Sequence, residues 1–384
     1  MQEIKIHPSI SEIPQEHWNQ LIVDNNPFIR HEFLKALEDH HCVGKSFGWL
    51  PRHISIYETN KAGKTSLIAA MPLYEKYNSY GEFVFDHAWA DAWQRAGLHY
   101  FPKLVSSAPY TPAQGQRLLA KPQDLEKVAP MLLQVAKEIA KQNNMSGLHV
   151  LFPSTTEQQW LEKQGMLVRH DCQFHWRNNS YQTFDDFLSA LTAKKRKNIR
   201  QERKRVQQSG VTFRVLDGHT ANEQDWDDMA RFYQSTFDEK WGTATLNAAF
   251  FKQVAQKMPE QIVLVLADKD EQCVAGSLMY RSDTTLYGRY WGCDEEIDKL
   301  HFEACYYQGI EYCIEHGLTL FEPGAQGEHK IARGFLPTLT QSSHWLVENP
   351  FQDSIKRYTE HEQVAVAEYI ESCNQHNPYK SSVL

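Results

Sequence analysis

The spacing of hydrophobic and polar residues predicts a mixture of helices and strands in the first half of the chain. Between 124 and 143, apolar residues recur every three or four positions, which predicts an amphipathic helix. Shorter apolar or alternating runs, bounded by turn residues, predict strands. The other helices expected are 11–23, 30–40 and 157–164, and the strands are 3–7, 53–57, 65–74, 81–85 and 148–152.

The second half follows a similar order. The segment 184–208 is predicted to be one long helix with a narrow apolar seam, and three strand-like runs then form a meander. The further helices expected are 226–240, 247–257, 300–316 and 329–334, and the strands are 261–267, 272–281, 284–292, 319–322 and 341–347. Neither half alternates strands regularly with crossover helices, which argues against a doubly wound sheet. The last residues, 374–384, are expected to be a frayed tail.

Short stretches of sequence recur in the two halves in the same order. The matched segments are 69–74 with 275–280, 80–86 with 287–294, and 147–153 with 317–323. In each half a glycine then precedes a His-Trp pair by ten residues, as Gly165 precedes His175 and Gly334 precedes His344. The series predicts an internal duplication, and a duplicated chain commonly places its ligand site where the copies meet.

Composition is typical of a globular protein with more than one domain. Of 384 residues, 41% are hydrophobic and 23% are charged, and this length predicts two or three domains. No apolar run approaches the roughly 20 residues of a membrane-spanning helix. The N-terminus lacks the pattern of a signal peptide, and the seven cysteines include no C-x-x-C pair. We therefore expect a cytoplasmic protein with reduced thiols and no membrane span.

Charge is distributed unevenly along the chain. The formal net charge is −8, yet the segment 194–205 carries eight basic residues and a single acidic one. A compact basic segment on an acidic body argues against general coating of nucleic acid, which favours a broad basic surface. It suits a site that holds one anionic group. Near its start, on successive helical turns, lie the candidate phosphate ligands Lys194, Arg196, Lys197 and Arg200. A solvated charged face is the alternative interpretation.

A polar turn after the predicted strand 319–322 is a second candidate for chemistry. The segment contains Gly324, Gly327, Glu328, His329, Lys330 and Arg333. Its glycines allow backbone amides to approach a ligand closely. Its glutamate and histidine are the first candidates for handling a proton, and its two cations are candidates for binding an anion. The same residue types are also typical of a helix cap with exposed charges.

The strand 284–292 contributes two further candidates. Tyr290 can donate a proton to a leaving thiolate or hydroxyl, and Asp294 at the strand end can bind an amine, although most strand aromatics belong to a core. No serine lies in a G-x-S-x-G elbow, and no cysteine has an evident histidine partner. His40-His41-Cys42 lacks a second ligand pair, so we expect neither a covalent nucleophile nor a metal site.

Several stretches resemble the bacterial FemAB-like proteins, labelled peptidoglycan biosynthesis/recognition, in the GNAT-type acyl-CoA N-acyltransferase superfamily. They are 80–93, 103–119, 148–153, 173–181, 184–206, 286–318 and FEPGAQGEHKIARGFLP at 321–337. The resemblance implies an α/β (α+β) fold of two tandem GNAT-like domains, each a mixed, mainly antiparallel sheet flanked by helices. We place the domains at 1–175 and 176–384. Fem transferases are similar in having a lysine and a Gly-Phe unit after the corresponding strand, which favours a functional turn.

One segment departs from the superfamily pattern. Acetyl-CoA-binding GNAT domains carry a Q/R-x-x-G-x-G/A loop whose amides hold a pyrophosphate, whereas the matching segment 293–300 is acidic and has no glycine. Four acidic residues would repel a pyrophosphate. Fem-type enzymes, which take aminoacyl-tRNA, also lack this loop.

The resemblance implies that an acyl group moves from an activated carrier to an amine, through alignment, oxyanion stabilisation and transfer of one proton. Three functions remain open. The first is an N-acyltransferase that uses acyl-CoA, and the second is a Fem-type peptidyltransferase that uses aminoacyl-tRNA. The third is a non-catalytic protein that binds peptidoglycan fragments. We expect no tightly bound cofactor, an amine acceptor such as a cell-wall precursor, transfer RNA as a partner in the second case, and no DNA.

Overall fold

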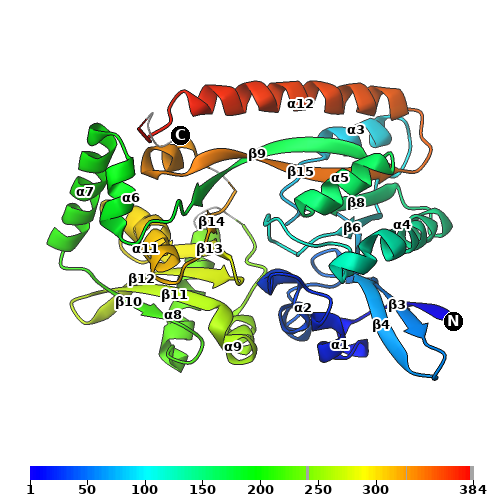
Figure 1. Cartoon of the computed structure of the whole chain (residues 1–384), viewed down its shortest axis with the longest axis horizontal. Coiled ribbons are helices and arrows are strands. Elements are labelled where there is room, and N and C mark those ends of the chain that lie inside the picture. Colours follow the sequence, from blue (N-terminus) through cyan, green and yellow to red (C-terminus); the bar gives the residue numbers. More distant parts are fainter. Residues whose placement is uncertain (239–241, 326, 381–384) are drawn as a thin grey trace. The chain divides into compact units, whose positions relative to one another are not determined.

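The computed structural model describes residues 1–238, 242–325 and 327–380, which form two compact units. Unit 1 comprises Met1–Asp171 and Thr340–Ala367, and unit 2 comprises Cys172–Leu339 and Glu368–Leu384 (Figure 1). Over the described residues, no helix combines the length and apolar character needed to cross a membrane. The expected end of helix 226–240 falls outside the described residues, as do Gln326 and 381–384.

Unit 1 contains two sets of strands, in the orders β1-β3-β4-β7 and β15-β8-β6-β5-β2. Neighbouring strands are antiparallel except for the parallel pair β6 and β8. The strands are β1 (Gln2–His7), β2 (Trp49–Pro51), β3 (His53–Thr59), β4 (Thr65–Met71), β5 (Tyr74–Lys76), β6 (Lys103–Ser106), β7 (Leu119–Ala120), β8 (Gly147–Leu151) and β15 (Leu336–Leu346). The helices are α1 (Gln15–Asn19), α2 (His31–Asp39), α3 (His87–Arg95), α4 (Leu125–Gln142) and α5 (Thr155–Lys163).

Helix α4 confirms the amphipathic helix expected at 124–143 and organises the core of unit 1. Its apolar face buries Val128, Leu132 and Ala136 completely, beside Leu104 of β6 and Leu148 of β8. Each such side chain contributes roughly 1.5–3 kcal/mol when it is fully buried. The parallel pair β6 and β8 is thereby covered on one face.

Unit 2 has the strand order β10-β11-β12-β13-β14-β9. All pairs are antiparallel except β13 with β14, which are parallel. The strands are β9 (Leu167–Arg177), β10 (Thr212–Leu216), β11 (Ile262–Lys269), β12 (Gln272–Arg281), β13 (Thr285–Cys293) and β14 (Leu320–Glu322). The helices are α6 (Phe184–Ala190), α7 (Ala193–Gln208), α8 (Glu223–Asp238), α9 (Ala248–Lys257), α10 (Leu300–Phe302), the π-helix η5 (Glu303–Tyr307), α11 (Gln308–Glu315) and the 3₁₀ turn η6 (Glu328–Arg333). Helix α12 (Gln352–Asn374) belongs to unit 1 up to Ala367 and to unit 2 from Glu368.

The helix expected over 184–208 is two helices, and the C-terminal tail is the reason for the break. Leu191 and Thr192 are both extended, and Thr192 is the N-cap residue of α7. Leu191 forms a β-bridge with Tyr379, and the Thr192 amide donates to the Pro378 carbonyl. The described part of the tail, up to Lys380, is therefore pinned to unit 2, and the expectation of a frayed tail was wrong there.

The strand expected at 81–85 is a loop between β5 and α3. Its acidic residues, Glu82 and Asp86, turn inward to the buried Lys103, while Phe83 and Phe85 point to solvent. Phe83 also adopts a positive φ of 58°, which is incompatible with a strand. Apolar and polar residues do alternate in this segment, but the segment forms a loop. The buried ion cluster of Glu82, Asp86 and Lys103 holds this loop in place.

The two His-Trp segments of the sequence repeat lie in opposite units. His175 and Trp176 end β9 in unit 2, where Trp176 faces Phe321 of β14. His344 and Trp345 end β15 in unit 1, where His344 faces His149 of β8. The sequence-based division into 1–175 and 176–384 treats each domain as one continuous segment, whereas 340–367 groups with unit 1 in the structure.

Candidate functional site

A pocket opens in unit 2 where two parallel strands stop pairing. The ladder between β13 and β14 ends at Tyr287 and Glu322. Strand β13 continues, and Arg289 is the extra residue of a β-bulge, because Leu278 faces Tyr290 while Met279 faces Gly288. At Gly288 the two chains remain so close that a Cβ would lie 3.2 Å from the Pro323 Cα. Within the described residues the ladder does not continue beyond that point, and the bulge residues Arg289 and Tyr290 line a pocket.

The pocket has a volume of about 300 Å³ and is mostly walled by aromatic and basic side chains. Its lining residues are Ser277, Gly288, Arg289, Tyr290, Trp291, His301, Cys305, Tyr306, Pro323, Gly324, Ala325, His329 and Lys330. Four of the residues expected from the sequence meet here, namely Tyr290, Gly324, His329 and Lys330. We call this space the split-strand pocket.

Lys330 holds the turn that borders the split-strand pocket. Its side chain is 2% exposed, and Nζ donates to the Gly324 carbonyl at 2.7 Å. Burial lowers the pKa of Lys330 to about 8, although Cys305 opposes the shift. An ammonium with two N–H groups left after this bond is a suitable donor to a developing oxyanion, and it is mostly protonated at neutral pH.

Two histidines line the same pocket. His329 Nε2 lies 2.9 Å from the Tyr306 hydroxyl, and burial together with Arg333 and Lys330 lowers its pKa. Burial and the nearby His329 lower the pKa of His301 to about 4. Both imidazoles are therefore neutral at pH 7 and can accept a proton. The sequence analysis had singled out His329 and had missed His301.

Two further pocket residues that the sequence analysis missed, Cys305 and Tyr306, lie on a π-helical turn. Residues Glu303–Tyr307 form the π-helix η5, in which each turn holds an extra residue. This places Cys305 and Tyr306 along the pocket while the next residue, Tyr307, donates to Glu202. Burial raises the pKa of Cys305 to about 12, so the thiol is protonated and does not serve as a thiolate nucleophile. A helical pattern assumed to be regular gives no signal for this turn.

Arg333 is a structural brace for the turn. Its guanidinium pairs with Glu202 of α7, with Nη2 2.6 Å from Oε1 and Nε 3.1 Å from Oε2. Nη1 donates to the His329 carbonyl at 2.7 Å, and the group lies 3.4 Å from the centre of the Phe302 ring. With its charge matched by a carboxylate, Arg333 is a weaker candidate for binding an anion than Lys330.

The proton-handling candidate Glu328 and the amine-binding candidate Asp294 do not line the pocket. Glu328 is exposed and accepts a hydrogen bond from the Tyr369 hydroxyl at 2.8 Å. Asp294 is paired with Arg231 at the end of β13. Gly327 has a φ of 116°, a backbone conformation that favours glycine, and a Cβ there would collide with the His329 ring. Its role in the structure is to let the histidine fold over the turn.

The basic side chains of helix α7 differ in whether they form ion pairs with acidic side chains. In the second half, Arg203 pairs with Glu303 and Glu311, and Arg205 pairs with Asp298. In the first half, Arg200 pairs with Asp185 through an exposed contact of 2.9 Å. Within the described residues, Lys194, Arg196 and Lys197 form no ion pair with an acidic side chain. These three cations on the opening turns lie beside the positive end of the helix dipole, which favours a bound anion.

Unit 1 has the equivalent strand pair, but the equivalent space is filled. Strands β6 and β8 pair in parallel up to Ser106 and Val150. Past that point, Arg117 Nε donates to the Leu151 carbonyl at 2.8 Å and the Gly115 amide donates to the Phe152 carbonyl at 3.1 Å. The segment 103–113 is buried throughout. The strand edge left open in unit 2 is thus satisfied by the chain itself in unit 1.

A family model described as peptidoglycan biosynthesis/recognition, FemAB_like, matches residues 9–381. The chain belongs to this FemAB-like family. The crystal structure of FemX is similar over 92% of this chain and 100% of its own, with a TM-score of 0.54 and 13% identity. The C-terminal domain of a putative lysylphosphatidylglycerol synthetase from Agrobacterium fabrum is similar over 92% and 97%, with a TM-score of 0.53 and 8% identity. No curated protein matches the chain.

Family and fold agree with the sequence-based resemblance. The FemAB-like assignment is confirmed, and so is an α/β fold with mixed, mainly antiparallel strands flanked by helices, which is similar to the fold of FemX. Over the described residues, no group of three or more His, Cys, Asp or Glu side chains is arranged to hold a metal ion.

Proposed function

We propose that the protein is an N-acyltransferase that moves an acyl or aminoacyl group from an activated carrier to an amine of a peptidoglycan precursor. The observation that carries this proposal is the split-strand pocket, which Lys330, His329 and Tyr290 line beside the point where the ladder between β13 and β14 ends. The family's description as peptidoglycan biosynthesis/recognition supports the class of acceptor. Such a site needs alignment, charge stabilisation and one proton acceptor, and these residues supply all three.

The proposed chemistry assigns one task to each side chain. The amine nitrogen attacks the acyl carbonyl carbon, so that a C–N bond forms and the carbonyl oxygen becomes an anion beside the Lys330 ammonium. His329 takes the proton that the amine loses, and Tyr306 fixes the orientation of its ring through the 2.9 Å contact. The bond between the acyl carbon and its carrier oxygen or sulfur then breaks. Tyr290 returns a proton to the departing atom, and no covalent enzyme intermediate is required.

The donor is the second part of the proposal, and α7 favours an aminoacyl-tRNA over acyl-CoA. Lys194, Arg196 and Lys197 are cations without acidic partners in the described structure, and they suit the sugar-phosphate backbone of a nucleic acid. The acidic segment 293–300 replaces the glycine loop that would hold a coenzyme A pyrophosphate. Acyl-CoA remains the alternative donor, with the same pocket and the same residues.

Ligand-induced changes in thermal stability test the donor and the acceptor separately. A ligand that binds only the native state raises the unfolding midpoint. We expect stabilisation by transfer RNA and by a nucleotide-linked muropeptide. Stabilisation by coenzyme A in place of transfer RNA would favour acyl-CoA. Stabilisation by the muropeptide alone would favour a binding protein without transfer activity and would contradict the proposal.

A further inference from the structure

A small pocket in unit 1 takes no part in the proposed transfer. It has a volume of about 190 Å³. It is lined by Val84, Phe85, Phe152, Arg169, His170, Asp171, Thr340, Gln341, Ser342, Glu362 and Val366, and we call it the β15 pocket. The lining combines apolar and aromatic side chains with hydroxyl and amide groups. A pocket with an apolar wall and a few converging polar groups is the usual form of a small-ligand site.

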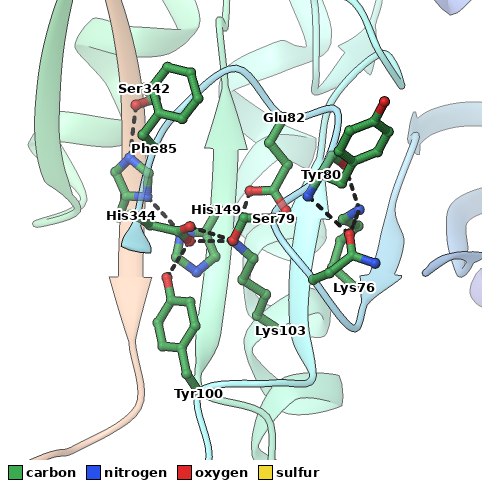
Figure 2. Close-up of polar contacts among 12 residues, drawn as sticks. Lys76, Ser79, Tyr80, Glu82, Phe85, Tyr100, Lys103, His149, Ser342 and His344 are labelled. Carbon is green, nitrogen blue, oxygen red and sulfur yellow. Dashed lines mark hydrogen bonds and ion pairs between the residues drawn. The ribbon is translucent and has the colours of Figure 1, made fainter. Parts of the chain in front are cut away.

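Phe85 is an exposed aromatic ring on a rigidly held backbone. Its side chain is 60% exposed at the pocket rim. The adjacent Asp86 is 2% exposed and pairs with Lys103, and it also accepts from the Ser79 hydroxyl at 2.5 Å and the Tyr100 hydroxyl at 2.6 Å (Figure 2). Glu82, three residues before Phe85, accepts a hydrogen bond from the same lysine at 2.7 Å. The loop is thus fixed from below while the phenyl ring faces solvent, which preorganises the ring as a contact surface.

Strand β15 contributes two buried hydroxyls to the pocket lining. Thr340 and Ser342 are two residues apart and so lie on the same face of the strand. Thr340 is 0% exposed, and among the described residues its hydroxyl has no hydrogen-bond partner. A buried hydroxyl without a partner costs about 1–3 kcal/mol, so a ligand that reaches it gains a bond at no further cost to the protein. Thr340 is the clearest sign of a polar ligand.

The second hydroxyl, that of Ser342, is oriented by a pair of histidines. Ser342 Oγ lies 2.8 Å from His344 Nε2, and His344 Nδ1 lies 2.7 Å from His149 Nδ1 (Figure 2). Burial lowers the pKa of both rings, to about 3 for His149, so both are neutral and share one proton between their Nδ1 atoms. Over the described residues, His149 Nε2 is buried without a partner. A hydrogen on His149 Nε2 would be a buried donor without an acceptor, so we place the proton on His149 Nδ1.

With the proton on His149 Nδ1, the donor and the acceptor of each hydrogen bond between His149, His344 and Ser342 are determined. His149 donates to His344, whose Nε2–H donates to Ser342, and the Ser342 hydroxyl keeps its own proton free to donate. The β15 pocket therefore offers one directed donor at Ser342 and a donor and acceptor at Thr340.

The arginine that lines the β15 pocket is matched by a carboxylate, and Asp171 adds a second acidic residue to the lining. Arg169 pairs with Glu362 through two contacts, of 3.0 Å from Nε and 2.6 Å from Nη2, and its Nη1 donates to the Phe85 carbonyl. Gln341 Nε2 lies 3.1 Å from His170 Nε2. A phosphate or carboxylate would need uncompensated positive charge, which a matched Arg–Glu pair does not supply. The pocket suits a neutral ligand that has an apolar face and a rim of hydroxyl or amide groups.

We propose that the β15 pocket binds one neutral sugar ring, with Phe85 against the apolar face of the ring. Thr340 and Ser342 bond to its hydroxyl or acetamido groups. A pyranose carries C–H groups on its faces and polar groups on its edge, which matches a lining of both apolar and hydroxyl-bearing side chains. Peptidoglycan is built on N-acetylated sugars, so the ligand class also fits the description of the family. The inference goes beyond the transfer reaction, because free sugar can bind without a donor or an amine.

Titration of the full-length chain with N-acetylglucosamine, followed by ligand-detected NMR, tests the site. We expect binding in the millimolar range, as befits a monosaccharide that makes few contacts. Phe85→Ala should weaken binding about tenfold or more, and Phe85→Trp should retain it. Thr340→Val keeps the shape of the side chain and should weaken binding about threefold to tenfold through one lost hydrogen bond.

Phe83→Ala is the matched control, because Phe83 is an exposed ring on the same loop and is 37% exposed but does not line the pocket. It should leave binding unchanged. Inorganic phosphate and alanyl-alanine serve as competitors and should not displace the sugar. Absence of sugar binding would overturn the proposal, as would equal losses in the Phe83 and Phe85 variants or displacement by phosphate. None of these results depends on transferase activity, so the two proposals can fail separately.

Discussion

Glu202 and Arg333 form a two-point ion pair between helix α7 and the turn η6. Glu202 is the single acidic residue among the basic residues of 194–205, and it points away from solvent to meet a guanidinium that is 7% exposed. The same carboxylate accepts the hydroxyl of Tyr307. Because Arg333 also holds the His329 carbonyl, this one carboxylate links the basic helix to the proton acceptor of the split-strand pocket.

Glu202→Gln should destabilise the fold and loosen the turn. It leaves the Arg333 charge largely buried without a counter-charge, and breaking such a pair costs about 3–5 kcal/mol. Arg205→Gln is the control on the same helix, because Arg205 and Asp298 are each 60% exposed and their pair contributes at most about 1 kcal/mol. Urea unfolding of both variants measures the difference. Equal losses in the two variants would mean that Glu202 is an ordinary surface charge.

The pH dependence of kcat/KM should be bell-shaped. His329 must be neutral to accept a proton, and burial lowers its pKa below the usual 6.5, so activity rises with pH along an acid limb whose midpoint lies below pH 6.5. Lys330 must be protonated to stabilise an oxyanion, and its pKa is about 8, so activity falls above that pH. Lys330→Arg keeps the charge at all these pH values and should remove the alkaline limb. An alkaline limb that persists in Lys330→Arg would assign that limb to another group.

Replacing Lys194, Arg196 and Lys197 together by glutamine should weaken donor binding. For a nucleic-acid donor, the loss of three phosphate contacts should reduce the slope of log affinity against log salt by about 2–3. The control replaces Lys61, Lys64 and Lys121, which are exposed residues of unit 1, and changes the net charge equally. Fluorescence anisotropy with labelled transfer RNA at several salt concentrations measures both. If the two triple variants have the same slope, Lys194, Arg196 and Lys197 do not hold the donor.

Lys103→Met should be strongly destabilising. Lys103 is 0% exposed and compensates both Glu82 and Asp86, which are buried. Removing it leaves two buried carboxylates without a cation, at a cost of about 3–5 kcal/mol or more. Lys127→Met, at a pair whose side chains are 60% and 39% exposed, should change stability by less than about 1 kcal/mol. The thermal midpoints of the two variants decide the matter, and a near-normal midpoint for Lys103→Met would refute the role of the ion cluster.

Local patterns predicted much of the fold because many elements follow from periodicity and caps. Helix α4 and the meander β11-β12-β13 lie close to where the spacing of apolar residues places them. The break at Leu191 and the loop at 81–85 could not be predicted in this way, since each depends on a distant partner. Leu191 is held extended by Tyr379, and the loop is held by Lys103.

The residues of the candidate site could be predicted where they lie close together in the sequence, but not where they depend on distant partners. The turn 324–335 supplied Gly324, His329 and Lys330 to the pocket because short loops place neighbours in sequence beside one another in space. Arg333 was expected to bind an anion, but its partner Glu202 lies 131 residues away in the sequence. Tyr306 depends on a π-helical turn and Arg289 on a strand bulge, and neither feature leaves a periodic signal.

Formation of an amide product by the purified chain tests the central claim most directly. Mass spectrometry would follow a nucleotide-linked muropeptide incubated with aminoacyl-tRNA or with an acyl-CoA, for the native sequence and for Lys330→Met and His329→Gln. We predict an acceptor whose mass increases by one acyl residue, at a rate that falls at least about 100-fold in each variant, as expected for the loss of an oxyanion donor or a general base. No product with either donor, or equal rates in all three proteins, would contradict the account.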